Sequence, residues 1–224
     1  MMTNKKSCYL AALALSVAVC SCGTASAKDS GVYLGVTAGQ SHFDVGDVSS
    51  GITGLPASFT KDESDTALSF SLGYRFNPFI AIEGAYADYG KATISSTNSF
   101  DYGGITFNTL DSRIAVNGGF AAVIGAIPAG DWEFSLKLGA FFANTKVTAH
   151  VGGMTDTSPT QLVDDTESES ASTVETLAGV GVGYTIANHY HFKAEWTRIP
   201  KVGDKEKTGE GDVTSLTLGL QYRF

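Results

Sequence analysis

Two histidines and a glutamate are the strongest candidates for chemistry in this chain. His189, His191 and Glu195 are separated by even numbers of residues, so on a β-strand they share one face. A metal site needs a third close ligand beside the histidines, and none is evident. The His-x-Ser pattern expected of a serine hydrolase that uses such histidines is also missing. We therefore predict no catalytic residue and no metal site.

A second candidate is the glycine series Gly179, Gly181 and Gly183, which superficially resembles a dinucleotide-binding loop. Such a loop must lead into a helix whose N-terminus holds the phosphates. Here the glycines alternate with Val180, Val182 and other apolar residues inside a strand pattern that leads to a turn. We predict no cofactor.

The elements that carry these residues are strands, because apolar residues recur at every second position. The clearest case is the C-terminus, where Leu216, Leu218, Leu220, Tyr222 and Phe224 alternate with polar or small residues. Such a strand is apolar on one face only. Eight segments show this pattern, at about 31–42, 65–76, 79–90, 110–127, 132–147, 172–186, 189–199 and 212–224.

The connections between these segments alternate between short and long. Tight-turn sequences at 77–78, 128–131 and 187–188 alternate with polar stretches at about 43–64, 91–109, 148–171 and 200–211. Antiparallel strands joined in this order place every long loop at one end. The predicted fold is therefore all-β, an eight-stranded antiparallel up-and-down transmembrane β-barrel, whose closure removes both sheet edges.

Alternation alone leaves two orientations open: a soluble barrel turns its apolar face inward, and a membrane barrel turns it toward lipid. The polar face is rich in Gly, Ser and Ala, which suits a narrow interior. Aromatic residues cluster on the apolar face near the short turns, namely Tyr74, Phe76, Phe79, Trp132, Phe134 and Tyr184. Together with the short turns and long loops, these features favour a barrel in the outer membrane. The high hydrophobic content of 43% would then be largely a lipid-facing surface.

Six charged residues fall on the face predicted to line the barrel interior. They are Arg75, Glu83, Arg113, Lys137, Lys193 and Glu195. Charges inside a narrow barrel are costly unless they are paired and hydrogen-bonded. We expect a structural ion network that fills the lumen, and the alternative is a polar gate.

The N-terminus has the features of an export signal. Lys5 and Lys6 precede an apolar stretch, and Ala25-Ser26-Ala27 matches the small-residue site that signal peptidase cleaves. We predict a signal peptide at 1–27, cleaved after Ala27, and a barrel domain at 28–224. The alternative is lipidation at Cys22. The three cysteines, Cys8, Cys20 and Cys22, all lie within this segment.

The formal net charge of −8 argues against a nucleic-acid partner, which would require a basic face. Much of the negative charge falls in two predicted loops. The loop at 148–171 carries Asp156, Asp164, Asp165, Glu167 and Glu169 without any Lys or Arg, and the loop at 43–64 is also acidic. We expect these loops to form a solvated, charged cell surface. The alternative hypothesis is that they contact a basic host or surface partner, or divalent cations that bridge to lipopolysaccharide.

The chain resembles the transmembrane domain of outer-membrane protein A and related small barrels. The resemblance rests on segments in a common order, including Gly31-Val32-Tyr33-Leu34-Gly35, Gly73-Tyr74-Arg75-Phe76-Asn77-Pro78 and the C-terminal Leu218-Gly219-Leu220-Gln221-Tyr222-Arg223-Phe224. It implies a lumen ion network, with Glu83, Lys193 and Glu195 at the best-matching positions. It also implies that Leu218, Leu220, Tyr222 and Phe224 form the signal recognised by the barrel assembly machinery.

These observations predict an integral protein of the outer membrane of a Gram-negative bacterium, surrounded by lipid and lipopolysaccharide and acting as a monomer. The expected role is structural or surface-interacting, in envelope integrity, adhesion or immune evasion, without catalysis. The alternative is a narrow porin-like channel for small solutes or ions. Eight strands leave room for side chains and not for a wide aqueous channel, although the small residues on the lumen face are compatible with weak conductance.

Overall fold

All regular secondary structure in the described part of the chain is β-strand. The computed structural model describes residues 30–45, 60–96, 100–102, 105–155, 162–205 and 207–224. No helix in these ranges is long and apolar enough to cross a membrane. The strands are β1 (Gly31–Val45), β2 (Thr60–Asp62), β3 (Ser64–Asn77), β4 (Ile80–Ser96), β5 (Phe100–Tyr102), β6 (Ile105–Ala129), β7 (Trp132–Thr155), β8 (Leu162–Ile186), β9 (Tyr190–Asp204) and β10 (Gly209–Arg223).

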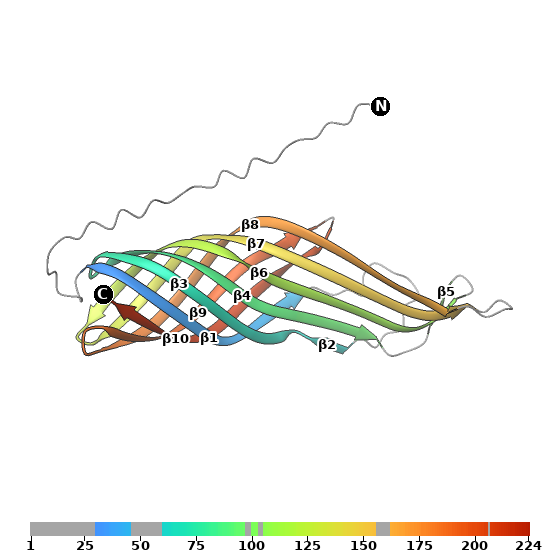
Figure 1. Cartoon of the computed structure of the whole chain (residues 1–224), viewed down its shortest axis with the longest axis horizontal. Coiled ribbons are helices and arrows are strands. Elements are labelled where there is room, and N and C mark those ends of the chain that lie inside the picture. The colour runs from blue at the N-terminus through green and yellow to red at the C-terminus, as the bar shows by residue number, and fades with distance from the viewer. Residues whose placement is uncertain (1–29, 46–59, 97–99, 103–104, 156–161, 206) are drawn as a thin grey trace, which may run out of the picture.

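Eight long antiparallel strands close into a barrel (Figure 1). The first strand closes it by pairing with the last, from Tyr33 opposite Arg223 to Val45 opposite Gly211. Strand β4 pairs directly with β6, and the three-residue strands β2 and β5 add to β4 and β6 at the loop end. The predicted eight-stranded up-and-down barrel is confirmed. The predicted signal peptide lies outside the described residues.

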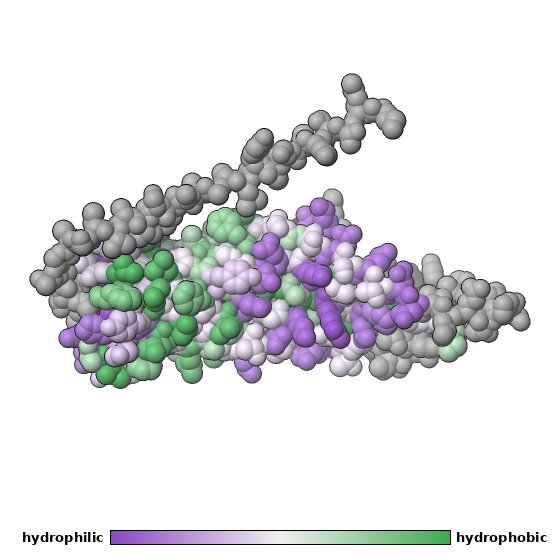
Figure 2. All heavy atoms as spheres, viewed as in Figure 1, coloured by the Kyte–Doolittle hydropathy of each residue, from purple (hydrophilic) through white to green (hydrophobic). Residues whose placement is uncertain are grey.

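The apolar face of the strands points outward. Leu68 is 59% exposed, whereas the adjacent Ala67, on the lumen face, is 2% exposed. All the aromatic residues expected near the short turns, from Tyr74 to Tyr184, are among the exposed large hydrophobic residues. Figure 2 shows that hydrophobic residues gather on the half of the barrel that holds the short turns, whereas hydrophilic residues cover the opposite half. We refer to this band of exposed hydrophobic residues as the apolar belt. At the loop end, the strands extend well beyond it.

This extension corrects the predicted loop at 148–171. Strand β7 continues to Thr155 and β8 begins at Leu162, and the two pair without interruption from Trp132 opposite Tyr184 to Met154 opposite Leu162. The extension was missed because residues 164–170 are polar on both faces of the strand, and Gly152-Gly153 interrupts the weak apolar alternation of Val147, Ala149 and Val151. Its Thr, Ser and Val residues nevertheless suit a paired strand. The predicted loop at 200–211 is likewise mostly strand.

A β-bulge in β4 reverses which residues face the lumen. Before it, Ala87 and Tyr89 point inward; after it, Ala92 and Ile94 do. Gly90 has a φ of +75°, and a Cβ atom there would lie 2.6 Å from the Asp65 carboxyl group. That carboxylate accepts a hydrogen bond of 2.9 Å from the Lys91 amide. Glycine is thus required both by its backbone conformation and by the close approach of Asp65.

The barrel also holds a buried apolar cluster, in addition to the larger set of apolar residues exposed on its outer face. Its larger members are Phe43, Tyr89, Val116, Phe120, Phe141, Leu177, Ile199, Val202 and Val213. The rings of Tyr89 and Phe141 meet edge to face with centroids 5.5 Å apart. We refer to these residues as the apolar plug.

Candidate functional site

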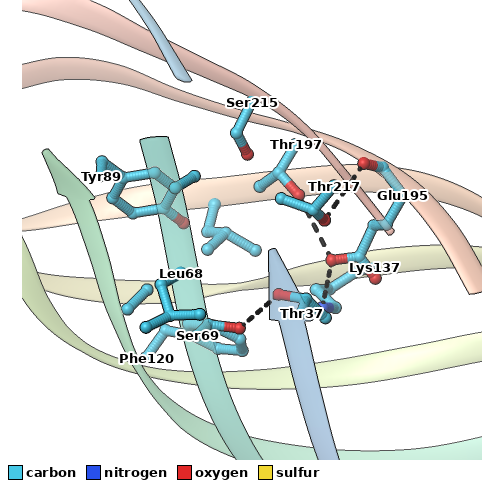
Figure 3. Close-up of a pocket in the computed structure, with 13 residues that line it drawn as sticks. Thr37, Leu68, Ser69, Tyr89, Phe120, Lys137, Glu195, Thr197, Ser215 and Thr217 are labelled. Carbon is cyan, nitrogen blue, oxygen red and sulfur yellow. Dashed lines mark hydrogen bonds and ion pairs between the residues drawn. The ribbon is translucent and has the colours of Figure 1, made fainter. Parts of the chain in front are cut away.

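Lys137 is the centre of a buried ion cluster in the lumen. Its Nζ lies 2.9 Å from Glu83 Oε1 on β4 and 2.6 Å from Glu195 Oε1 on β9. Lys193, two residues before Glu195, adds a contact of 3.2 Å from its Nζ to Glu195 Oε2. Figure 3 shows Lys137 and Glu195 meeting inside the barrel. Two lysines thus face two glutamates across the lumen, so these buried charges balance.

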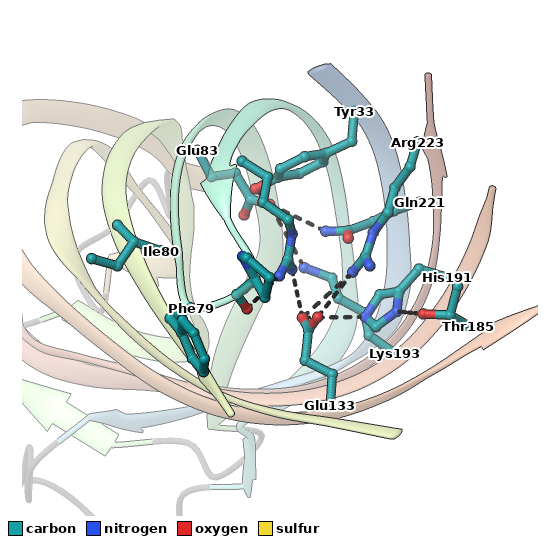
Figure 4. Close-up of polar contacts among 12 residues, drawn as sticks. Tyr33, Phe79, Ile80, Glu83, Glu133, Thr185, His191, Lys193, Gln221 and Arg223 are labelled. Carbon is teal, nitrogen blue, oxygen red and sulfur yellow. Dashed lines mark hydrogen bonds and ion pairs between the residues drawn. The ribbon is translucent and has the colours of Figure 1, made fainter. Parts of the chain in front are cut away.

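A second ion cluster lies nearer the short turns and surrounds Glu133 (Figure 4). Arg75 Nη2 lies 2.7 Å from Glu133 Oε1, and Arg223 Nη2 lies 3.3 Å from Glu133 Oε2. His191 Nε2 is 3.8 Å from the same carboxylate, while its Nδ1 lies 3.0 Å from the Thr185 hydroxyl. Strands β3, β7, β9 and β10 are therefore linked across the lumen.

Hydrogen bonds to Glu83 bring β1 and β10 into the ion cluster around Lys137. The Tyr33 hydroxyl donates to Glu83 Oε2 over 3.1 Å, and Gln221 Nε2 donates to the same oxygen over 3.3 Å. The Tyr33 ring occupies the space where a side chain at Gly73 would lie. This close packing explains one of the lumen glycines: Gly73 makes room for the ring that holds Glu83.

The structure places five of the six predicted lumen residues in the lumen: Glu83, Lys137, Lys193 and Glu195 form one cluster, and Arg75 belongs to the other, around Glu133. Arg113 is different. It points outward from β6, because its strand neighbours with even numbers face the lumen, and it is exposed. Its predicted lumen position is therefore wrong. The segment at 110–127 is apolar on both faces around 121–127, so its alternation does not define the inward side.

Sequence reasoning did not select Glu133, Arg223, Tyr33 or Gln221 for the network. A usable signal was present for three of them, since Glu133, Gln221 and Arg223 alternate with outward apolar residues in segments 132–147 and 212–224. Tyr33 and Gln221 join the network only because β1 and β10 pair in the register that places both beside Glu83.

The two histidines expected to share a face do not come together. His189 lies in the turn before β9, is exposed and stacks on the Tyr222 ring at 5.8 Å between centroids. His191 is buried beside Glu133, whereas Glu195 pairs with lysines. In the ranges that the structure describes, no group of three His, Cys, Asp or Glu side chains is arranged to hold a metal ion.

The two ion clusters and the apolar plug fill the middle of the lumen, whereas cavities of about 190 Å³ and 200 Å³ remain toward its loop end and its turn end. Between Lys137 and the plug lies a cavity of about 20 Å³, lined among others by Tyr89, Phe120 and Leu177 (Figure 3). Lys137 Nζ lies 5.0 Å from the centroid of the Phe120 ring. A cavity of this size holds about one water molecule. The arrangement provides packing and charge pairing across the lumen.

Above the barrel, the predicted acidic residues lie on a strand. Asp164, Asp165, Glu167 and Glu169 are exposed on the loop-end part of β8, and Asp156 falls outside the described residues. His150 Nε2 on β7 lies 2.8 Å from Asp164 Oδ1. The other face of the strand carries Asp165, Glu167 and Glu169, at alternate positions on the lumen side of β8.

Comparison with known proteins places these features in a family. Residues 11–224 match the family described as the outer membrane protein beta-barrel domain. A comparison with curated proteins finds no match.

Three solved barrels are similar to the chain. Ail of Yersinia pestis is 13% identical over 87% of this chain and 99% of its own, with a TM-score of 0.45. Neisserial surface protein A is 12% identical over 86% and 97%, with a TM-score of 0.46. OprG of Pseudomonas aeruginosa is 13% identical over 88% and 98%, with a TM-score of 0.48.

Proposed function

The chain belongs to the outer membrane protein beta-barrel domain family, and from this premise we propose that it is a non-catalytic barrel with a structural and surface-interaction role. The observation that carries this proposal is the combination of a filled lumen and an acidic hairpin that projects from it. The hairpin consists of residues 147–155 of β7 and 162–169 of β8, and we call it the β7–β8 extension. It extends past the apolar belt together with residues 105–113 of β6, which pair with β7 up to Thr155.

The filled lumen supports this role over a channel. An open pore would need a continuous aqueous path, but the Glu133 cluster, the Lys137 cluster and the apolar plug are stacked across the barrel. Opening a path would separate buried ion pairs, which is costly. In planar lipid bilayers, the purified barrel should give no porin-sized current steps. Such steps in the wild-type protein would favour the channel.

The charges of the β7–β8 extension support a surface role. Its acidic residues are exposed and face away from the lipid belt, and a negatively charged surface attracts a basic partner or divalent cations that bridge to lipopolysaccharide. Lipid and lipopolysaccharide surround the belt, the barrel assembly machinery inserts the chain, and the barrel acts as a monomer. Adhesion, envelope integrity and immune evasion are the processes in which such a surface would act.

The test is a hairpin truncation in the native cell. A deletion strain is complemented either with the full chain or with a chain in which 148–168 is replaced by Asn-Gly. This replacement closes the paired residues Val147 and Glu169 with a two-residue turn. We expect the truncated barrel to restore envelope integrity and to lose adhesion or serum survival. Full restoration of every phenotype by the truncated chain would contradict the surface role.

A further inference from the structure

One edge of β8 is unpaired over its loop-end half. Strand β8 pairs with β9 only from Ala178 opposite Arg198 to Ile186 opposite Tyr190. On its other edge, the pairing with β7 continues to Leu162. Among the residues that the structure describes, no strand pairs with the second edge of 162–177. At a rise of 3.3 Å per residue, this edge is roughly 50 Å long. Figure 1 shows β7 and β8 running far past the end of β9.

The edge is open because β9 turns away from β8. The ladder ends at Arg198, just before Pro200, which has no amide hydrogen to donate. Lys201 has a φ of 57°, and its amide donates to Asp212 Oδ1 on β10 over 3.1 Å. Asp212 also accepts from Arg198 Nη2 over 2.6 Å. The backbone of β9 is therefore held against β10 at the point where β8 continues alone.

The open edge lacks several features that commonly protect strand edges. An unpaired edge offers a row of N–H and C=O groups to any extended chain, and proteins commonly block such edges with charged side chains, especially Lys, with Pro or with a β-bulge. The only charged side chains at 162–177 are acidic, so they repel acidic chains and leave the edge open to basic ones. Residues 162–177 contain no Lys, Arg, Pro or Gly. The ladder to β7 has no register shift, so the edge is also continuous.

The charge of the edge limits which chains can pair with it. Asp165, Glu167 and Glu169 lie on one face at alternate positions and are exposed, and Glu175 follows on the same face. No ion pair engages Glu167 or Glu169 within the described ranges of the chain. Like charges placed opposite one another destabilise a strand pair, so a second copy of this edge is disfavoured. A strand with Lys or Arg at alternate positions would place its charges opposite the acids.

We propose that the free edge of β8 at 162–177 binds a basic, extended segment of a partner protein by adding it to the sheet as a further strand. Main-chain hydrogen bonds to the edge provide the affinity, and the alternating acids select the partner's basic side chains. This inference rests on the surface-interaction role proposed above and specifies how contact is made.

The experiment uses the full barrel in detergent micelles and a labelled decapeptide of alternating Lys and Thr. Binding is followed by fluorescence anisotropy. The key control is the same peptide with N-methyl groups on alternate amides, which keeps the charge and removes the hydrogen-bond donors of one edge. Both edges are methylated in turn, in two peptides. We expect the unmodified peptide to bind and at least one methylated peptide to bind at least about tenfold more weakly.

Two matched protein variants test the role of the acids. The variant Asp165→Asn/Glu167→Gln/Glu169→Gln should weaken binding of the unmodified peptide at least about tenfold. The variant Asp44→Asn/Asp62→Asn/Glu63→Gln removes the same charge from the opposite side of the same barrel end and should change binding less than about twofold. All six side chains lie in the described, solvent-accessible part of the chain, so both variants should keep the wild-type circular dichroism melting curve.

The outcomes separate this inference from the proposed function. The three peptides could bind the wild-type barrel equally well, and all could lose binding in the Asp165→Asn/Glu167→Gln/Glu169→Gln variant. This result would mean that charge alone attracts the partner. Strand addition would then be wrong and the surface role would stand. Unchanged binding of the unmodified peptide by the Asp165→Asn/Glu167→Gln/Glu169→Gln variant would also overturn strand addition at this edge. Failure of the surface role itself is measured independently, by the phenotypes of the hairpin truncation.

Discussion

At the scale of single residues, the lumen is organised around charges that have partners on several strands. Lys137 contacts carboxylates from β4 and β9, and Glu133 contacts cations from β3 and β10. Each contact joins strands that are not sequence neighbours. Removing one partner of a buried pair leaves the other charge uncompensated, which commonly costs about 3–5 kcal/mol. The interior charges therefore contribute most through the penalty for losing any one of them.

Glu83→Ala tests this reasoning. The substitution removes a partner of Lys137 and leaves the Tyr33 hydroxyl and the Gln221 amide without their acceptor. We expect the free energy of unfolding to fall by about 3–5 kcal/mol, measured by urea unfolding in lipid vesicles, with no large conductance in planar bilayers. Glu167→Ala, at an exposed position, is the control and should change stability by less than about 0.5 kcal/mol. Equal stability of the two variants would contradict the network.

Arg113→Met and Lys137→Met form a second matched pair, which tests the corrected orientation of β6. Lys137 is 3% exposed and makes two close ion pairs, whereas Arg113 points outward and is exposed. We expect Lys137→Met to destabilise the barrel by about 3–5 kcal/mol and Arg113→Met to change it by less than about 0.5 kcal/mol. Urea unfolding of both variants measures the difference. A large loss of unfolding free energy in Arg113→Met would contradict its outward orientation and indicate that Arg113 belongs to the lumen network.

At the scale of elements, bulges decide where the regular barrel ends. The bulge at Gly90 turns the upper part of β4, and the irregularity at Lys201 takes β9 away from β8. In both cases the amide of a lysine donates to an aspartate on the adjacent strand, Lys91 to Asp65 and Lys201 to Asp212. A side-chain carboxylate thus replaces the ladder acceptor that the bulge removes.

Gly90→Ala should destabilise the barrel by about 1–3 kcal/mol, because alanine disfavours the positive φ and its Cβ would meet Asp65. Gly125→Ala is the matched control, since nothing lies within 4 Å of a Cβ atom there. Thermal unfolding of both variants in the same detergent provides the comparison. A Gly90→Ala variant as stable as Gly125→Ala would show that the bulge tolerates a side chain.

At the scale of the whole molecule, the barrel is divided into a part with an apolar exterior and a polar projecting part. Figure 2 shows the division directly: hydrophobic residues gather at the turn end and hydrophilic residues toward the loop end. The lumen is divided along the same direction, with ion clusters near the turns and the apolar plug toward the loops. The apolar belt matches the hydrocarbon region of a membrane, and the β7–β8 extension is the part that we propose contacts partners.

Export of the chain is a prediction that belongs to this scale. We propose that the chain is cleaved after Ala27, so that the mature protein begins at Lys28 and loses Lys5 and Lys6 together with all three cysteines. Removal of two lysines makes the mature chain more acidic than the formal −8 of the full sequence. Intact-mass measurement of protein extracted from outer membranes should give the mass of 28–224. A mass that corresponds to a lipid-modified chain beginning at Cys22 would support the alternative.

Much of the barrel was predictable because strand residues alternate between two environments. Segments such as 212–224 show this alternation in the sequence itself, and the tight turns at 77–78, 128–131 and 187–188 separate neighbouring strands. Alternation also assigned Glu83, Lys137, Lys193 and Glu195 to one face. It failed for Arg113, where both faces are apolar nearby, and for 148–171, where residues 164–170 are polar on both faces.

The sequence by itself therefore determined the local pattern: the strands, their order, the eight-stranded closure and most of the inward charges. Only the tertiary structure decided which of those charges meet, because partners such as Lys137 and Glu195 belong to strands on different sides of a closed lumen. It also decided that β8 continues past β9 with an open edge. Pairing between strands depends on register and bulges, and these are set by contacts between distant segments, such as the one between Lys201 and Asp212.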